Sequence, residues 1–495
     1  MTFRRVLVAN RGEIAIRVIR ACRESGIQSI AVFSDADADA PHVGEADVSV
    51  RIGPAAPSDS YLSIEALVEA AASTGADAVH PGYGFLSENP AFARACEAAG
   101  CVFIGPPADV MERMGSKIAA RALMVAAGVP VVPGAVPADQ SDAGVAAAAA
   151  EIGYPVLVKA SAGGGGKGMR VVHRAASAGD LISAARREAA GAFGDGTLYI
   201  ERLVEQPRHV EVQIFGDHHG NVVHLFEREC SVQRRHQKVV EESPSPALTP
   251  GLRAAMCSAA IAAARAAGYR NAGTIEFLLE GSGDEARFYF LEMNTRLQVE
   301  HPVTEAVTGV DLVRAQLTVA AGGALPWTQA ELSQRGHAIE VRVYAEDPAS
   351  GFLPQAGPLL LYREPQGPGI RVDSGVREGG VVGVNYDPLL AKLTVLAETR
   401  PAAIARALAA LRDFPVLGIR TNIPFLARVL DHPEFREGRL HTGFIEEHLE
   451  SLLRASDPPL EAVAAAAAGG SEARVFDVPH SAQPDPWSTL NGWGR

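Results

Sequence analysis

The chain has 495 residues, of which 47% are hydrophobic and 21% charged, a composition that fits a globular protein of about two to four domains and excludes a disordered or fibrous one. The net charge of −13 argues against a nucleic-acid partner, because phosphate backbones are bound by clustered positive charge. No apolar run is long enough to cross a membrane or to form a signal-peptide core, and the five cysteines are scattered without CxxC spacing. These features predict a cytoplasmic protein with no membrane partner.

Residues 4–110 alternate short β-branched runs with amphipathic patterns. Strands are predicted at RVLVA, SIAVF, DAVHPGYG and CVFIG, and helices at 13–24 and around 63–73. Strands that alternate with helices and glycine turns are typical of a parallel, doubly wound sheet, so an α/β domain is expected first.

A smaller group of elements is predicted next, around a glycine run. PVLVKA and MRVV flank the run as strands, a helix is expected near 177–192, and TLYIERLV is a further strand. From 208 to 300 strands dominate, with one hairpin formed by HVEVQIFGD and NVVHLFERE and another by TIEFLLE and RFYFLEMN.

The last part of the chain is more mixed. Residues 337–447 combine strands with an Ala-rich helix after Pro401, which favours an α+β class for the later domains. The stretch 455–472 has low complexity and predicts a linker before a short tail.

The glycine run, KASAGGGGKGMRVV, allows more than one interpretation. A P-loop is excluded because Lys167 is followed by Gly168 rather than by Ser or Thr. Gly163, Gly165 and Gly168 match the dinucleotide fingerprint, but that fingerprint requires a helix where MRVV predicts a strand. What remains is a glycine hairpin whose backbone N–H groups close over phosphate oxygens, with a flexible loop as the alternative. Lys159, on the strand that enters the run, favours phosphate binding.

A carboxylate pair is predicted on the second hairpin. Glu276 and Glu292 are equidistant from Asp284 in the connecting GSGDEA, so a regular register places them directly opposite each other on one face. Opposed side chains of like charge repel at this separation. A magnesium ion resolves the conflict, because it favours one or two carboxylates together with substrate phosphates.

Polar residues continue along the same strand with a period of two. In an extended chain all of them face one way, namely Glu292, Asn294, Arg296, Gln298 and Glu300. A half-solvated surface strand shows the same alternation and is the alternative. A second cluster, SVQRRHQK, is basic; taken alone it indicates a solvated patch, and its short length in an acidic chain argues against nucleic-acid binding.

Eight segments occur in one order: RVLVANRGEIA, HPGYGFLSEN, MGSKIAAR, KASAGGGGKGM, ECSVQRRHQKVVEE, TIEFLLE, FLEMNTRLQVEHPVTE and HAIEVRVYAEDP. Together they resemble the biotin carboxylase family of ATP-grasp enzymes, over about residues 3–447. The resemblance implies an ATP-grasp fold with an N-terminal doubly wound parallel-sheet domain, a glycine-loop lid and a C-terminal mixed domain. The implied ranges are 1–115 for the N-terminal domain, 116–330 for the ATP-grasp domain with its lid at about 132–203, 331–450 for the C-terminal domain, and 451–495 for a linker and tail.

The resemblance also implies an activity. A biotin carboxylase is an ATP-dependent ligase that transfers a carboxyl group from bicarbonate to the N1′ nitrogen of biotin through carboxyphosphate, with magnesium or manganese. This is the first half-reaction of an acetyl-CoA or other acyl-CoA carboxylase, as in fatty acid biosynthesis. A homodimer is implied in the same way.

The acceptor biotin is expected on a biotinylated carrier, either a separate protein or a further segment of a longer chain. A biotin-bearing domain shows a lysine flanked by methionines near its C-terminus, and no Met follows Met293. The expected partners are therefore a biotin carboxyl carrier protein and a carboxyltransferase subunit.

By the same resemblance, individual residues take roles in binding the nucleotide and its metal. Lys117 and Lys159 correspond to lysines that hold the ATP phosphates, and Gly165 and Gly166 to lid glycines. Adenine and the nucleoside would be met by Glu201, Arg202, Leu203, Val204, His209, Gln233 and His236. The family more often has Lys at the position of Arg202, which puts that side-chain contact in question. The magnesium ligands would be Glu276, Glu292 and Asn294.

The resemblance places the carboxylation chemistry further along the same strand. Glu300 corresponds to the general base, which takes the bicarbonate proton. The bicarbonate pocket corresponds to Lys238, Arg296, Gln298, the backbone of Val299, and Glu300.

The biotin side of the site is implied by a second group of residues. Arg296 and Arg342 would stabilise the negative charge that develops on carboxyphosphate and on the ureido oxygen of biotin. Tyr83 would border the biotin site, with Glu88 nearby.

Three other functions fit parts of the pattern. A different ATP-grasp ligase would share the glycine run and the metal glutamates, but not SVQRRHQK or RLQVEHPVTE. A catalytically silent ATP-binding subunit is disfavoured by the intact Glu276, Glu292, Arg296 and Glu300. A nicotinamide oxidoreductase is disfavoured by the strand that follows the glycine run.

Overall fold

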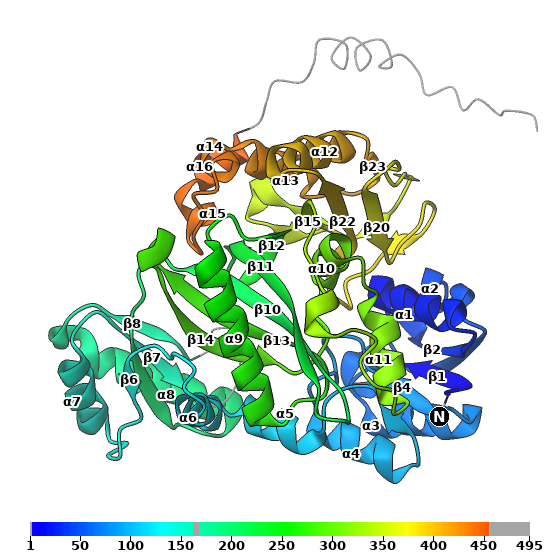
Figure 1. Ribbon diagram of the computed structural model, residues 1–495. Coiled ribbons are helices and arrows are strands. Elements are labelled where there is room, and N and C mark those ends of the chain that lie inside the picture. The colour runs from blue at the N-terminus through cyan, green and yellow to red at the C-terminus, as the bar shows by residue number, and fades with distance from the viewer. Residues whose placement is uncertain (1, 162–167, 455–495) are drawn as a thin grey trace, which may run out of the picture. The chain divides into compact units, whose positions relative to one another are not determined.

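The computed structural model of the protein describes residues 2–161 and 168–454, and Figure 1 shows its elements along the chain. Residues up to Leu452 form one compact unit, which holds every site discussed below. A second unit begins at Leu453, and only Leu453 and Arg454 of it are described. None of the helices in the described ranges is long and apolar enough to cross a membrane.

The N-terminal elements form a parallel sheet in the order β3-β2-β1-β4-β5. Its strands are β1 (Arg5–Val8), β2 (Gln28–Ser34), β3 (Val48–Gly53), β4 (Ala78–His80) and β5 (Val102–Phe103), and its helices are α1 (Gly12–Glu24), α2 (Pro41–Glu45), α3 (Ile64–Thr74) and α4 (Pro90–Ala98). The chain builds outward from β1 in one direction and then, from β4, in the other. This order confirms the predicted doubly wound sheet.

A smaller antiparallel sheet follows in the order β6-β9-β7-β8. It is preceded by α5 (Ala108–Gly115) and α6 (Lys117–Ala126), and it consists of β6 (Gly134–Ala135), β7 (Val156–Ala160), β8 (Arg170–Val172) and β9 (Leu198–Arg202) with α7 (Asp142–Ile152) and α8 (Ala178–Phe193). β7 and β8 pair antiparallel, as the hairpin interpretation requires. The glycine run at 162–167 lies outside the described residues, and with it the predicted lid glycines Gly165 and Gly166.

The largest sheet is antiparallel, in the order β14-β13-β10-β11-β12-β15-β22-β20. Its strands are β10 (Arg208–Gly216), β11 (Val222–Arg234), β12 (Gln237–Ser243), β13 (Asn271–Glu280), β14 (Arg287–Asn294), β15 (His337–Tyr344), β20 (Ile370–Ser374) and β22 (Leu389–Ala397). The β10–β11 and β13–β14 pairs confirm both predicted hairpins. Because β12 pairs with β15, the sheet continues without a break from the central strands into the C-terminal ones (Figure 1).

The structure departs from the sequence expectation for residues 208–300 in two places. First, strands do dominate this range, but the 18-residue helix α9 (Pro250–Ala267) within it was not expected; Thr249 caps its start, and its alanines are good helix formers that pack closely under the sheet. Second, β14 ends at Asn294, so the alternating polar residues do not continue on a strand to Glu300. The chain leaves the sheet there because the backbone N–H of Thr295 donates to the carboxylate of Glu88 instead of to a neighbouring strand.

Shorter elements complete the C-terminal part of the first unit. α12 is the Ala-rich helix expected after Pro401, and it begins one residue earlier, at Arg400, with Thr399 as its cap. The elements are α10 (His301–Thr308), α11 (Leu312–Ala320), β16 (Glu346–Asp347), β17 (Leu353–Pro354), β18 (Gly357–Pro358), β19 (Leu361–Tyr362), β21 (Val381–Val382), α12 (Arg400–Arg412), β23 (Val416–Leu417), α13 (Ile423–Asp431), α14 (Pro433–Arg436), α15 (Phe444–Glu447) and α16 (Leu449–Leu453).

The segment 295–300 between β14 and α10 is anchored by an apolar side chain. Leu297 is fully buried in a core to which β1, α1, β10 and α11 also contribute. The polar neighbours of Leu297 are thereby directed away from this core. The segment is therefore positioned by packing rather than by strand pairing.

Replacement of Leu297 by Ala is expected to lower the free energy of unfolding by about 2–5 kcal/mol, because it leaves a cavity in a packed core. Calorimetric melting of the two proteins measures the change. Leu360→Ala is the control: Leu360 is 70% exposed, and its removal should cost less than about 0.5 kcal/mol. Equal melting temperatures for both variants would contradict the anchoring role.

Candidate active site

Two glutamates face each other across β13 and β14. The ladder pairs Glu276 with Glu292, as predicted. The pairs nearer the turn, however, are in a register that would place Glu276 opposite Leu291. A bulge between Glu276 and Phe277 absorbs one extra residue of β14 and restores the opposed pair. The regular register expected from the sequence is wrong, although the pair derived from it is right.

The ammonium group of Lys238, on β12, lies between three carboxylates. Its Nζ donates to Glu211 Oε2 at 2.6 Å, to Glu276 Oε1 at 2.8 Å and to Glu300 Oε1 at 2.7 Å. Burial alone would lower the pKa of Lys238, but the three carboxylates outweigh it and raise that pKa well above its ordinary value. Lys238 is therefore a fixed positive charge at the centre of the cluster.

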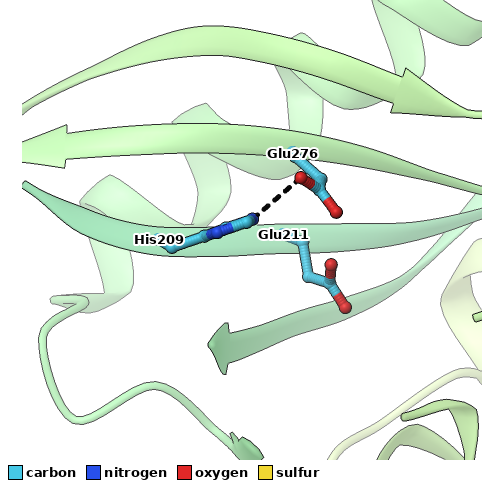
Figure 2. A group of neighbouring side chains, drawn as sticks. All are labelled: His209, Glu211 and Glu276. Atoms are coloured by element: carbon cyan, nitrogen blue, oxygen red, sulfur yellow. Dashed lines mark ion pairs between the residues drawn. The ribbon is translucent and has the colours of Figure 1, made fainter. Parts of the chain in front are cut away.

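Figure 2 shows two of these carboxylates together with an imidazole. His209 and Glu211 are two residues apart on β10 and project from one face, and Glu211 is directly opposite Glu276 on β13. His209 Nε2 lies 3.0 Å from Glu276 Oε2. Desolvation alone would lower the pKa of His209, but the negative charge of Glu276 overrides it and raises the pKa.

A second buried cation supports the cluster from β11. Arg228 and Glu211 are both fully buried, and Arg228 Nε donates to Glu211 Oε1 at 2.5 Å. Arg228 also donates to Gln213 and Thr304, each at 2.8 Å. Neither Arg228 nor Glu211 was predicted from the sequence. The period-two pattern of HVEVQ could have revealed Glu211, because it follows His209 on the same face.

Glu300 accepts from two cations. Besides Lys238, it is bound by Arg342, whose Nη2 donates to Glu300 Oε2 at 2.9 Å and whose Nε donates to Glu241 at 2.6 Å. Burial alone would raise the pKa of Glu300, but Lys238 and then Arg342 outweigh it and hold the pKa well below its usual range. Glu300 is thus a carboxylate at neutral pH, and its basicity is low while both cations face it.

Arg296 joins the N-terminal domain to the predicted metal ligands. Its Nε donates to Glu88 Oε2 at 2.9 Å, its Nη2 to Asn294 Oδ1 at 3.2 Å and its Nη1 to Gln298 Oε1 at 2.5 Å. Gln298 in turn donates to Glu276 Oε1 at 3.2 Å. The structure therefore brings these residues together, although the segment that carries them is not a strand.

The two lysines predicted to hold phosphates come from α6 and β7. Desolvation lowers the pKa of Lys117; the negative charge of Glu292 opposes this shift, and the positive charge of Lys159 adds to it. Lys159 Nζ donates to Glu201 Oε2 at 2.6 Å, and Arg121 donates to Glu201 Oε1 at 3.0 Å. Glu201, predicted to lie near adenine, therefore neutralises the lysine from the end of β9.

The rest of the predicted adenine segment is held by the protein itself. Arg202 makes a bidentate ion pair with Glu280: its Nη1 donates to Oε1 at 2.7 Å and its Nη2 to Oε2 at 2.8 Å. The backbone N–H of Leu203 donates to Pro155 at 3.0 Å, and the side chain of Val204 is buried. The arginine that stands in place of the usual lysine is thus directed to β13.

The basic cluster SVQRRHQK forms the β11–β12 hairpin. Arg235 and His236 occupy the two-residue turn with φ of 49° and 66°, and positive φ at both positions matches the twist of the strands. Gln233 is buried directly opposite Lys238 on the paired strands, whereas His236 is exposed at the turn. The hairpin therefore directs one lysine of the cluster into the site.

Tyr83 lies in the loop that follows β4 and is half-buried. Its hydroxyl donates to Glu13 Oε1, and Lys392 Nζ lies 5.8 Å from the centre of its ring. Glu13 and Lys392 were not singled out from the sequence, which gives no local signal for either.

The predicted metal ligands fit a magnesium ion. Asn294 Nδ2 donates to Glu276 Oε1 at 2.8 Å, and Glu276 is opposite Glu292 on the paired strands. All three side chains carry the oxygen donors that magnesium prefers. Glu292 is exposed as a residue, yet its carboxyl is crowded: desolvation and then the negative charge of Glu276 raise its pKa. A divalent cation would relieve this repulsion.

The hairpin β7–β8, the lysines Lys117 and Lys159 and the glutamate pair on a neighbouring antiparallel sheet are the arrangement expected of an ATP-grasp fold. Family models described as "Biotin carboxylase, N-terminal domain", "Carbamoyl-phosphate synthase L chain, ATP binding domain" and "Biotin carboxylase C-terminal domain" match residues 2–111, 116–328 and 340–447. A curated biotin carboxylase of Halalkalibacterium halodurans is 52% identical over 448 residues, which cover 90% of this chain and 98% of that protein. The chain belongs to the biotin carboxylase family.

Other relatives are longer than this chain. The mitochondrial methylcrotonoyl-CoA carboxylase subunit alpha of Rattus norvegicus is 51% identical over 450 residues, and the match spans 91% of this chain but only 62% of that protein. The family and the ATP-grasp fold predicted from the sequence are confirmed.

Solved structures are similar over most of the chain. A Campylobacter jejuni biotin carboxylase in complex with β-γ-ATP has a TM-score of 0.87 at 45% identity, over 90% of this chain and 99% of that one. A biotin carboxylase domain dimer of Hydrogenobacter thermophilus 2-oxoglutarate carboxylase, with MgADP, ADP and bicarbonate, also has a TM-score of 0.87 at 45% identity, over 92% and 100%. Both structures are of biotin carboxylases that hold an adenine nucleotide, and the Hydrogenobacter structure also contains magnesium and bicarbonate.

Glu276→Gln is expected to raise the magnesium concentration for half-maximal ATP hydrolysis by about tenfold or more, because it removes one of the opposed carboxylates. The measurement is a magnesium titration at fixed ATP. Glu285→Gln, an exposed residue in the turn of the same hairpin, is the control and should titrate like the parent. A parent-like titration for Glu276→Gln would contradict the assignment.

Proposed function

We propose that this chain carboxylates the N1′ nitrogen of biotin with bicarbonate, in the first half-reaction of an acyl-CoA carboxylase. One observation carries the proposal: a buried carboxylate, Glu300, shares two cations, Lys238 and Arg342, beside the paired glutamates on β13 and β14. A base, an anion-binding pocket and a metal site are thereby within one cluster. This is the set of groups that activation of bicarbonate by ATP requires.

The nucleotide would bind between the small sheet and the large one. Lys117 and Lys159 would contact the phosphates, together with the backbone of the glycine run. The base and ribose would lie along the end of β9 and near His209, Gln233 and His236. Glu276, Glu292 and Asn294 would hold magnesium, which would supply positive charge to offset the negative charge that develops on the phosphates.

Bicarbonate would bind where Lys238 and Arg296 present N–H donors, with Gln298 beside them. Its oxygen attacks the γ-phosphorus of ATP, the bond from that phosphorus to the bridging oxygen of ADP breaks, and the bicarbonate proton passes to Glu300. The products of this step are carboxyphosphate, ADP and protonated Glu300.

The two cations that face Glu300 explain how bicarbonate binding would turn this carboxylate into a base. Lys238 and Arg342 hold its pKa low. When bicarbonate takes hydrogen bonds from Lys238, part of that positive charge is shared with the new anion, and the pKa of Glu300 rises toward the value at which it accepts a proton. Proton acceptance is therefore coupled to bicarbonate binding.

Biotin would enter beside Tyr83, with the guanidinium of Arg342 placed to stabilise the ureido oxygen. N1′ attacks the carboxyl carbon of carboxyphosphate, the bond from that carbon to the phosphate oxygen breaks, and the N1′ proton passes to the released phosphate. We infer that the biotin belongs to a biotin carboxyl carrier protein, and that the final acceptor is chosen by a carboxyltransferase partner. A homodimer and a cytoplasmic location complete the proposal. The dimeric Hydrogenobacter domain supports the former.

ATP hydrolysis should depend on bicarbonate and rise further when free biotin is added. The measurement is phosphate release with neither addition, with bicarbonate, and with both. Release that is indifferent to both would contradict the proposed reaction and favour a different ATP-grasp ligase.

Glu300→Gln is expected to lower bicarbonate-dependent turnover by at least about 10²-fold while nucleotide binding stays near normal, because the amide keeps the shape of the carboxylate but takes no proton. Glu340→Gln is the matched control: Glu340 is also fully buried but accepts from Thr394 and contacts neither Lys238 nor Arg342 by hydrogen bond. Unchanged turnover in Glu300→Gln would remove Glu300 as the base.

A further inference from the structure

Lys392 is a fully buried lysine with three partners from distant parts of the chain. Its Nζ donates to the backbone carbonyl of Val299 at 2.8 Å, lies 3.2 Å from Glu13 Oε1, and lies 5.8 Å from the ring centre of Tyr83. The lysine is on β22, Glu13 is on α1, and Val299 is in the segment 295–300. One ammonium group therefore ties together three parts of the first unit.

The place of Lys392 in the large sheet is fixed by pairing on both sides. It is directly opposite Arg342 on β15 and opposite Asp373 on β20. Directly opposed residues project from the same face, so Lys392 emerges beside the arginine that binds Glu300. The sheet thus presents two cations to the segment 295–300, one to a side chain and one to the backbone.

The backbone contact bears on the geometry of the site. The carbonyl of Val299 belongs to the peptide unit that ends at the Cα atom of Glu300. A hydrogen bond to that carbonyl therefore fixes the orientation of the peptide plane and, with it, the Cα atom that carries the Glu300 side chain. Glu300 must lie within hydrogen-bond reach of both Lys238 and Arg342. Rotation of this peptide plane would displace the carboxylate from one or both.

The other partner of Lys392 extends to the biotin side of the site. Glu13 Oε1 accepts from the Tyr83 hydroxyl as well as pairing with Lys392. A buried ammonium group is stable only when it is paired and hydrogen-bonded, and the Val299 carbonyl and Glu13 meet that need together. Desolvation raises the pKa of Glu13 to about 7, and the positive charge of Lys392 opposes the shift.

We infer that Lys392 is a positioning residue: it holds the bicarbonate segment by the Val299 carbonyl and, through Glu13, joins that segment to Tyr83 at the biotin side. The inference rests on the proposed function of the site. Lys392 acts through Glu300 and Tyr83 and need not touch a substrate.

Lys392→Met keeps the length of the side chain and removes the donor. It is expected to raise the KM for bicarbonate by about tenfold or more while the KM for ATP stays within about twofold, because the nucleotide contacts lie elsewhere. Glu13→Gln keeps the Val299 contact and should leave the bicarbonate KM within about threefold but raise the KM for free biotin. A merely structural role would not separate the three constants in this way.

The double variant E13Q/K392M is a control for misfolding of Lys392→Met. It removes both members of the Lys392–Glu13 ion pair, so it leaves less uncompensated buried charge than Lys392→Met does, and it still lacks the donor to Val299. Its bicarbonate KM should match that of Lys392→Met. A parent-like bicarbonate KM in the double variant would overturn the inference. So would an equal rise in the KM values for bicarbonate, ATP and biotin in both Lys392→Met and the double variant.

Arg400→Met is the matched control. Arg400 is another largely buried cation of the C-terminal part, with a glutamate partner, Glu242, and two backbone carbonyls, Phe435 and Arg436. Its loss should reduce stability without changing the bicarbonate KM. If the parent shows no bicarbonate-dependent hydrolysis, the proposed function fails; if the parent does but Lys392→Met behaves like Arg400→Met, only the positioning role fails.

Discussion

The sharing of one ammonium group, that of Lys238, among Glu211, Glu276 and Glu300 is the interaction on which the site depends. Without this positive charge, three buried carboxylates within reach of one atom would repel one another and their ionised forms would be unstable. With it, Glu276 and Glu300 are kept ionised: burial alone would raise the pKa of both, but the positive charge of Lys238 lowers it. In the proposed reaction Glu276 would bind the metal and Glu300 would act as the base. The same arrangement makes the site responsive, because an anion that binds Lys238 must compete with these carboxylates.

The continuous antiparallel sheet explains how cations from separate regions reach this cluster. β12 carries Lys238, and its pairing with β15, followed by β22, places Arg342 and Lys392 one and two strands away. The site therefore does not lie in a loop between two independent folds. Lys238, Arg342 and Lys392 are carried on paired strands, which hold side chains more precisely than a flexible connection would, whereas Arg296 and Glu300 lie on the packed segment 295–300.

The sequence predicted the elements that depend on local pattern and missed those that depend on distant contacts. The doubly wound sheet and both hairpins follow from short-range periodicity and turn residues, and so does the opposition of Glu276 and Glu292. The end of β14 at Asn294 does not, because it depends on Glu88 and on Leu297 in a distant core, and no local signal marks the bulge that restores the opposition. The helix α9 was missed although its Thr249 cap and its alanines are local signals. Glu211 could have been found from its spacing to His209. Lys392 could not, because its partner Val299 is 93 residues away.

The most direct test of the account is a crystal structure with a non-hydrolysable ATP analogue, magnesium and bicarbonate. The account predicts a bicarbonate ion within hydrogen-bond distance of Lys238 Nζ and the Arg296 guanidinium, a Glu300 carboxylate oriented toward its hydroxyl, and magnesium bound by Glu276 and Glu292. A bicarbonate ion bound away from Lys238, with that lysine still held by all three glutamates, would contradict it.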